Sequence, residues 1–236
     1  MTGRPGLIHL HCGDVAAGIH RRSGLPGDFR VWRDSPAVGP WSANPKDLGT
    51  LRAIWWGVPL PDMQDLPQLQ DLARATEAVL WFGPDPWEQA CLLWVLAELP
   101  EGTFPDLVPL DCGVGHMAPA ALPRCFAERR LLEERELQEA RGLWNTFLAH
   151  GWGALGGAQM AAFPHLGSAL ARLAEDHPPT GPGRTARQVR QLLDEGVKDM
   201  PALLRGMAQL EDGRHGAWCG DLYLARVAEA MGVRLA

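Results

Sequence analysis

Short apolar runs alternate with segments of helical spacing in the first part of the chain. Four of these runs have β-strand character: residues 6–12 (GLIHLHC), 28–32 (DFRVW), 78–83 (AVLWFG) and 106–112 (DLVPLDC). Pro109 in the fourth run favours an edge position or a strand that ends early. Strands that alternate with helices are typical of a mostly parallel sheet with right-handed crossovers. We therefore predict an α/β fold, with a Rossmann-like domain over residues 1–125 and the first three runs as its central strands.

Two of the helical segments carry sequence signals for their starts. Asp14 comes directly before a helical pattern that stops at Gly24, so we expect Asp14 to be the N-cap and Gly13 to form the turn. Asp85 precedes the second pattern, with a proline at the first helical position and Glu88 three residues after the cap. This spacing predicts a capping box at the start of that helix.

After the fourth run the strand pattern ends, and we predict that residues 126–236 form an all-helical region. Its expected helices lie near residues 128–149, 163–178, 184–196, 200–211 and 219–232. The stretch 36–71, rich in Pro and Trp, favours a loop with short helices, one of them at 45–56. Residues 180–236 allow a winged-helix-like bundle, but 211–220 is short for the hairpin of a wing.

Polar residues follow every predicted strand at the point where it ends. In chain order they are Gly13 and Asp14, Arg33 and Asp34, Asp85 with Glu88 and Gln89, and Asp111 and His116. Because the carboxyl ends of parallel strands meet at one edge, these residues are expected to line a crevice, where open α/β sheets bind ligands. The competing interpretation is that they are ordinary caps and turns.

We therefore expect a small anionic or nucleotide-like ligand at this edge, bound by Gly13, Asp14, Arg33, Asp34, Asp85 and Gln89. Arg33 would pair with an anion, the backbone of residues 13–16 would hold a phosphate, and the carboxylates would act as general bases or Mg²⁺ ligands. The chain lacks both the P-loop pattern and the dinucleotide-binding fingerprint. No particular reaction, catalytic residue or cofactor is therefore indicated.

Two further sets of residues bear on the chemistry. His9 and His11 would point to one face of a strand, as paired metal ligands do, but no third ligand follows at a known metal spacing. We accordingly predict no metal site. Most of the 10 tryptophans are expected in the core, because an indole buries a large area. Trp41 and Trp87, which we place in loops, are the candidates for a platform on which a base stacks.

The composition is that of a globular protein, with 46% hydrophobic and 21% charged residues. No apolar run approaches the ~20 residues that cross a bilayer, and the N-terminus makes a poor signal peptide. Five scattered cysteines do not indicate a disulfide framework. We expect Cys12, Cys91 and Cys112 to be buried free thiols. These features favour a bacterial, cytoplasmic protein without membrane association.

The formal net charge of −6 does not favour a polyanionic partner. From residue 165 onward acidic and basic residues are equal in number, so this part is neutral. An alternative function is a regulatory or nucleic-acid-associated role for the C-terminal helices, through Arg184, Arg187 and Arg190. Such a stripe is more commonly a solvated face. The last helix would instead serve interdomain or homodimer packing through Leu222, Val227 and Met231.

Two blocks of the sequence, residues 8–41 and 78–96, carry a family resemblance. They resemble the opening strand–turn–helix–strand and the second block of a bacterial family known as domain of unknown function 1835. The residues in common are His9, Gly13, Asp14, Ala17, Trp32, Arg33, Asp34, Gly39, Pro40, Trp81, Phe82, Asp85 and Gln89. Residues 163–193 and 219–231 resemble its winged-helix-like companion region. The resemblance implies the fold and the site at the strand ends, and no reaction. Val15 stands where the family has a hydroxyl residue, which removes one expected phosphate contact.

Overall fold

The centre of the fold is a five-stranded sheet with the strand order β2-β1-β3-β4-β5. The computed structural model describes residues 6–59, 67–211 and 218–235. The strands are β1 (Leu7–Cys12), β2 (Asp28–Trp32), β3 (Glu77–Trp81), β4 (Asp106–Leu107) and β5 (Arg130–Leu131). The first four pair in parallel, and β4 and β5 pair antiparallel. The predicted α/β fold with a mostly parallel sheet is therefore confirmed.

Three details of the sheet differ from the prediction. β2 is an edge strand rather than a central one, because β1 pairs with β3 on its other side. β4 has only two residues and ends before Pro109, which cannot donate a ladder hydrogen bond. β5 lies at residues 130–131, inside the stretch predicted to be all helical. A strand of two residues is too short to leave an alternating pattern, and a helical pattern follows it at once.

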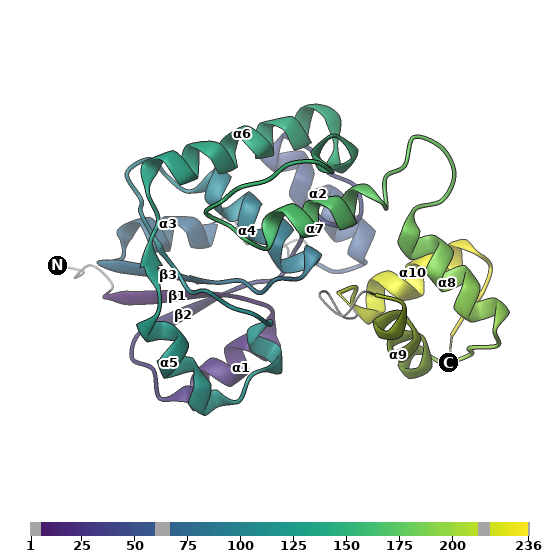
Figure 1. Cartoon of the computed structure of the whole chain (residues 1–236), viewed down its shortest axis with the longest axis horizontal. Helices are drawn as coiled ribbons and strands as arrows, with labels where there is room; N and C mark the ends of the chain where they lie inside the picture. The colour runs from purple at the N-terminus through teal and green to yellow at the C-terminus, as the bar shows by residue number, and fades with distance from the viewer. Residues whose placement is uncertain (1–5, 60–66, 212–217, 236) are drawn as a thin grey trace.

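Helices cover both faces of the sheet (Figure 1). The helices of this part are α1 (Asp14–Ser23), α2 (Pro45–Trp56), α3 (Pro67–Arg74), α4 (Pro86–Glu98), α5 (Leu122–Ala127), α6 (Glu134–His150) and α7 (Leu166–Ala174), with 3-10 turns η2 (Val114–His116), η3 (Pro119–Ala121) and η4 (Trp152–Leu155). α1 and α5 lie on one face, and α3 and α4 lie on the other. α6 and α7 pack on α4, so α4 is enclosed between the sheet and a further helical layer.

The start of α4 follows the predicted capping pattern in part. Asp85 is the N-cap, and its side chain accepts a 2.9 Å hydrogen bond from the backbone N–H of Glu88. The Glu88 carboxylate accepts from the N–H of Gly83 rather than from that of the cap residue. The cap is confirmed, and the reciprocal bond of the capping box is replaced by one that holds the turn after β3.

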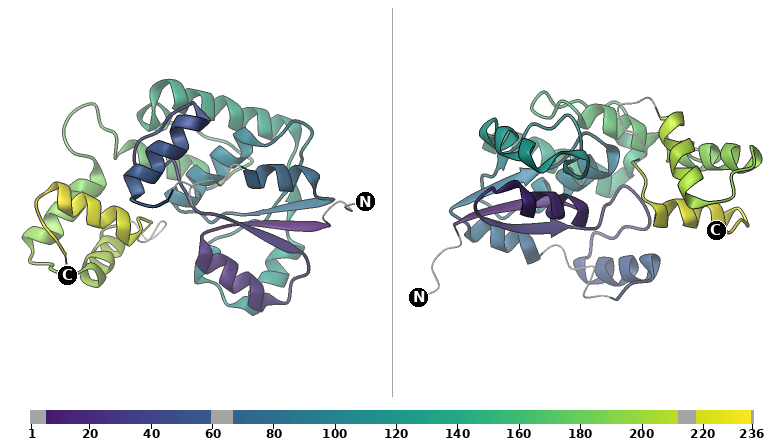
Figure 2. Two further views of the ribbon diagram at one scale, coloured as in Figure 1. Left: turned by 180° about the vertical axis from the view of Figure 1, so that it is seen from behind. Right: turned by 90° about the horizontal axis from the view of Figure 1, so that it is seen from below.

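The last three helices, α8 (Arg184–Asp194), α9 (Met200–Leu210) and α10 (Asp221–Ala230), pack together beyond the carboxyl ends of the strands (Figures 1 and 2). The buried guanidinium of Arg172 in α7 donates to Glu211 and Thr185, which fixes this unit to α7. α6 and α7 pack on α4, although both follow residue 125 in the chain. The predicted division at residue 125 stays a prediction. Most of the segment 211–220 lies outside the described residues, and the winged-helix-like arrangement stays a prediction.

The side chains of the core fit most of the sequence expectations. Trp32, Trp81, Trp94, Trp144, Trp152 and Trp218 are buried. All five cysteines are free thiols, and Cys91 is buried as predicted. Cys12 is only half-buried, and Cys112 is exposed because it follows the short β4 into a surface turn. Within the described residues, no helix has the length and apolar character needed to cross a membrane.

Candidate functional site

The register of β1 and β2 brings Asp14 next to Arg33. Cys12 pairs with Trp32 across the two parallel strands, and the N–H of Gly13 donates a further 2.8 Å bond to the carbonyl of Trp32. Arg33 Nε and Nη2 then donate to Asp14 Oδ2 and Oδ1 at 3.2 and 3.0 Å. The two side chains are 51% and 70% exposed, so this bidentate ion pair lies on the surface.

Asp14 is not the N-cap of α1, which corrects the prediction. Gly13 holds the N-cap position with φ 81°, a left-handed conformation that glycine adopts without steric cost. Asp14 is the first residue of the helix, where its charge still interacts favourably with the helix N-terminus. The turn at Gly13 thus directs the Asp14 carboxylate to Arg33 instead of to the helix backbone.

A cavity of about 350 Å³ lies between the strand ends and the first turn of α10. It is lined by Arg33, Trp56, Val58, Trp87, Gly220, Asp221, Leu222 and Tyr223, and we call it the aromatic cavity. The ring centroids of Trp56 and Trp87 are 6.1 Å apart. Three aromatic rings and one guanidinium therefore face a space that only the C-terminal helices complete.

Asp34 is buried and serves the structure of this wall rather than facing the aromatic cavity. Arg52 donates to both of its carboxylate oxygens, and the backbone N–H of Ser35 donates to Oδ1. Trp56 Nε1 also donates to Oδ1, at 3.0 Å. Asp34 thus holds the indole of Trp56 in place and joins the end of β2 to α2.

Asp85 and Glu88 form a second group at the same edge of the sheet. Burial raises the pKa of Asp85 to about 6, and burial with repulsion from Asp85 raises that of Glu88 to about 8. Two carboxyl groups with these values keep a proton between them at neutral pH. The electrostatic interaction with His116 acts in the opposite direction and lowers the pKa of Asp85.

The turn after β3 and the loop after β4 cover this carboxylate pair. A Cβ on Gly83 would lie 2.6 Å from Gly113 Cα, and a Cβ on Gly113 would lie 2.6 Å from Glu88 Oε1. The contact at Gly83 is with backbone, so this position requires glycine for the two segments to approach so closely. The contact at Gly113 is with the end of the Glu88 side chain, which can shift. Across this loop, a Cβ on Gly115 would contact Val15, which places η2 against the start of α1.

Gln89 and Asp111 lie on the other side of α4 from Arg33. Gln89 is buried, and its Nε2 donates a 2.7 Å bond to the carbonyl of Gly83. Together with Asp111 it lines a different cavity of about 530 Å³. The aromatic cavity and this one share no lining residue among those described.

The predicted site residues thus divide into separate environments. The structure brings Gly13, Asp14 and Arg33 together and buries Asp34 in an ion pair. Asp85 is the N-cap of α4, and Gln89 lies at another cavity. Trp87 lines the aromatic cavity from the first turn of α4 rather than from a loop, while Trp41 packs against Trp94 and Trp144. Whether these residues bind a ligand stays a prediction.

The sequence interpretation missed two aromatic residues of the cavity, Trp56 and Tyr223. Trp56 is the last residue of α2. Its place in the cavity wall depends on its hydrogen bond to Asp34, which is 22 positions away in the sequence. Tyr223 lies on α10, for which packing was expected. Leu222 of that predicted packing face is 60% exposed, and Leu224 and Ala228 are the buried residues of α10 instead. Tyr223 is the single tyrosine of the chain and lies at the start of a helix far from the strands in sequence, so no sequence pattern indicated that it lines a site.

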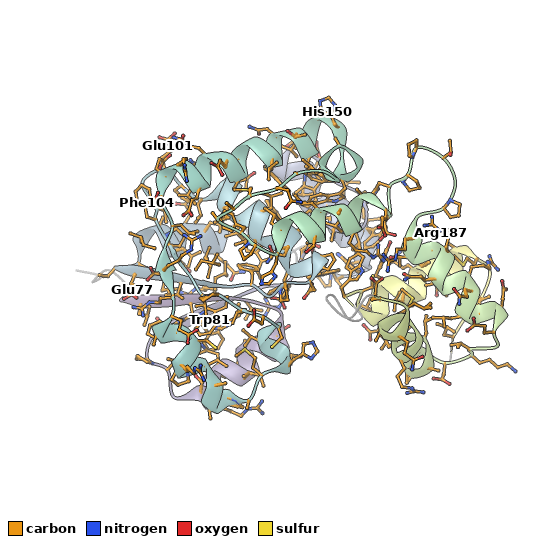
Figure 3. The ribbon with its side chains drawn as sticks, viewed as in Figure 1. Glu77, Trp81, Glu101, Phe104, His150 and Arg187 are labelled. Atoms are coloured by element: carbon orange, nitrogen blue, oxygen red, sulfur yellow. The ribbon has the colours of Figure 1, made fainter. Side chains whose placement is uncertain are left out.

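His9, His11 and His20 form a buried cluster around Trp81, and His9 also lies beside Phe126 of α5. Trp81 is labelled in Figure 3. Trp81 Nε1 donates to His9 Nδ1 at 3.0 Å, and the nitrogens His11 Nε2 and His20 Nδ1 are 2.9 Å apart. Burial lowers the pKa of all three histidines. The pKa of His11 falls to about 2 and that of His20 to about 4. Within the described residues, no group of three or more His, Cys, Asp or Glu is arranged to hold a metal ion.

Comparison with family models and with curated proteins finds no match to this chain. The resemblance to domain of unknown function 1835 therefore stays a prediction.

Proposed function

We propose that the chain binds a small anionic ligand that carries a planar ring, as a nucleotide does, in the aromatic cavity. The observation that carries this proposal is the set of groups on its wall: three aromatic rings and the guanidinium of Arg33 face one space of about 350 Å³. A cavity of this size is within the range that small-molecule sites occupy.

The ring of the ligand would stack on Trp87, Trp56 or Tyr223, since an aromatic side chain offers every base the same apolar face. Its anionic group would lie against Arg33, whose planar fork suits a phosphate or a carboxylate. The Asp14 carboxylate occupies two donors of that fork, so the incoming anion exchanges for it or binds beside it.

The proposal is confined to binding. Asp85 and Glu88 have the raised pKa values of an acid–base pair, but they lie outside the lining of the aromatic cavity. The described contacts do not favour the nucleic-acid alternative: Arg184 donates to Glu175, and Arg187 donates to the carbonyl of Pro182.

A thermal-shift screen followed by calorimetric titration tests the proposal. The probes are adenosine and uridine 5′-monophosphates, adenosine, and ribose 5-phosphate, because they separate the ring from the anion. We expect the monophosphates to raise Tm most, since binding to the native state stabilises it in proportion to occupancy. A short DNA duplex at low and moderate salt is the parallel arm. No Tm shift and no binding heat with any monophosphate at about 1 mM, a weak-binding concentration, would overturn the proposal.

A further inference from the structure

The cavity of about 530 Å³ beside α4 shares no described lining residue with the aromatic cavity, although α4 contributes side chains to both. Its wall is mostly apolar, with Phe82, Leu92, Leu107, Val108, Leu110 and Phe163 among its residues. The residues come from α4, from the ends of β3 and β4 and the chain after β4, from β5 and α6, and from the segment 161–165 that precedes α7. Of these, only Gln89 and Asp111 were expected above to lie at a ligand site.

Gln89 presents a buried hydrogen-bond acceptor on this wall. Its side chain is fixed, because Nε2 donates to the Gly83 carbonyl at 2.7 Å. The residue is 3% exposed, and its Oε1 has no hydrogen-bond partner among the described residues. Exchanging the amide nitrogen and oxygen would place two carbonyl oxygens together and lose the bond to Gly83. A buried polar atom without a partner is costly, so a donor from outside the chain would stabilise Oε1.

Two charged residues of the same wall, Arg130 and Glu136, are already satisfied by one another, and a third, Asp111, is exposed. Arg130 Nη1 donates to both carboxylate oxygens of Glu136, and Arg130 Nη2 donates to the carbonyl of Ala162. Glu136 also accepts from the N–H of Glu133. The acceptor of Gln89 is neutral, so an ammonium group placed there would lose its hydration without a compensating charge. The chemistry favours a neutral donor.

We propose that this cavity is a second ligand site, for a small apolar molecule that carries one neutral N–H or O–H group. The apolar body fills the space between Phe82 and Phe163, and the donor binds Gln89 Oε1. This inference is independent of the aromatic cavity, since the two walls have no described residue in common.

Indole and 1-methylindole are matched probes, because they differ in whether the ring nitrogen carries a donor. Titration followed by protein NMR should show indole binding about 2- to 10-fold more tightly than 1-methylindole, the range expected for one hydrogen bond. Benzylamine, which is charged, should bind more weakly than indole. Contacts from indole protons to Phe163 in the wild-type chain should place it in this cavity without any substitution.

Two variants locate the site. Ala162→Phe fills the cavity while it leaves Gln89 and the backbone bond from Arg130 in place, and it should abolish indole binding. Ala208→Phe, at an exposed position of α9, is the matched control and should bind indole as the wild type does. Trp87→Ala should also leave indole binding unchanged, which separates this site from the aromatic cavity. Absence of indole binding, equal affinity for 1-methylindole, or unchanged binding by Ala162→Phe would each overturn the proposal; the cavity would then hold water only.

Discussion

Trp56 Nε1 donates a 3.0 Å hydrogen bond to Oδ1 of Asp34, and this bond joins one wall of the aromatic cavity to the end of β2. The same carboxylate receives the buried guanidinium of Arg52, whose side chain is 1% exposed. Arg52 also donates to the carbonyls of Ser35 and Val38, so the chain from residue 34 to 40 is folded around it. A buried ion pair therefore places an aromatic ring of the proposed site.

Asp34→Asn should destabilise the fold strongly. It leaves the Arg52 charge buried without its counter-charge, which is expected to lower the free energy of unfolding by about 3–5 kcal/mol. Urea denaturation measures this loss. Asp71→Asn is the matched control, because Asp71 pairs with Arg30 at partly exposed side chains and should cost less than about 1 kcal/mol. Equal losses in the two variants would contradict the structural role of Asp34.

Asp14→Ala should have little effect on stability, in contrast with the cap role that the sequence favoured. Gly13 holds the cap position, and the Asp14–Arg33 pair is exposed, so we expect a loss below about 1 kcal/mol in urea denaturation. Asp85→Ala is the comparison, since it removes an observed cap and should cost at least about 1 kcal/mol. A larger loss for Asp14→Ala than for Asp85→Ala would contradict this assignment.

Substitutions of Trp87 and Arg33 in the aromatic cavity should weaken the binding of different probes. Trp87→Ala should weaken adenosine monophosphate and adenosine alike, by about 5- to 150-fold for the loss of one stacking surface. Arg33→Lys should weaken the monophosphate but not adenosine, because an ammonium does not reproduce the planar fork. Calorimetric titration of both variants with both probes measures the difference. An Arg33→Lys effect on adenosine would contradict the assigned anion contact.

The local rules of sequence were sufficient for the strands β1 and β3, for the cap at Asp85 and for the stop of α1 at Gly24, whose φ is 78°. Each depends on residues within one turn or one strand. The arrangement of the candidate site depends on contacts between segments that are distant in the sequence, and no local pattern predicts such contacts. The bond from Trp56 to Asp34 and the approach of Tyr223 to Trp55, at 6.2 Å between ring centroids, arise only when α2 and α10 come together.

The same distinction explains why the strand-end residues did not meet in one crevice. Their positions at the carboxyl edge followed from the parallel sheet, but their exposure depended on what covers each strand end. The loop with Gly113 closes over Glu88, whereas the end of β2 stays open beside Arg33. Hydrophobic periodicity carries no information on such coverage.

Acid should destabilise the fold through the buried histidines. Folding lowers the pKa of His11 from 6.5 to about 2 and that of His20 to about 4, so the unfolded chain binds more protons below pH 6.5. Stability contributed by these groups is complete above pH 6.5 and falls as pH drops toward 4. Urea denaturation between pH 4.5 and 7.5 measures this slope. His20→Gln should reduce it, whereas His150→Gln, at an exposed position labelled in Figure 3, should not.

The carboxylate pair should have the opposite dependence on pH. Folding raises the pKa of Asp85 from 3.8 to about 6 and that of Glu88 from 4.5 to about 8, so the native state binds more protons between these limits. The stability that these groups contribute is therefore lost as pH rises from about 4 to about 8. Glu88→Gln keeps an acceptor for the Gly83 N–H and removes the charge, so its stability relative to the wild type should increase from pH 5 to pH 8.5. Glu101→Gln, at an exposed position, is the control and should show a constant difference. If Glu88→Gln and the wild type change in parallel over this range, the pair does not share a proton in the folded state.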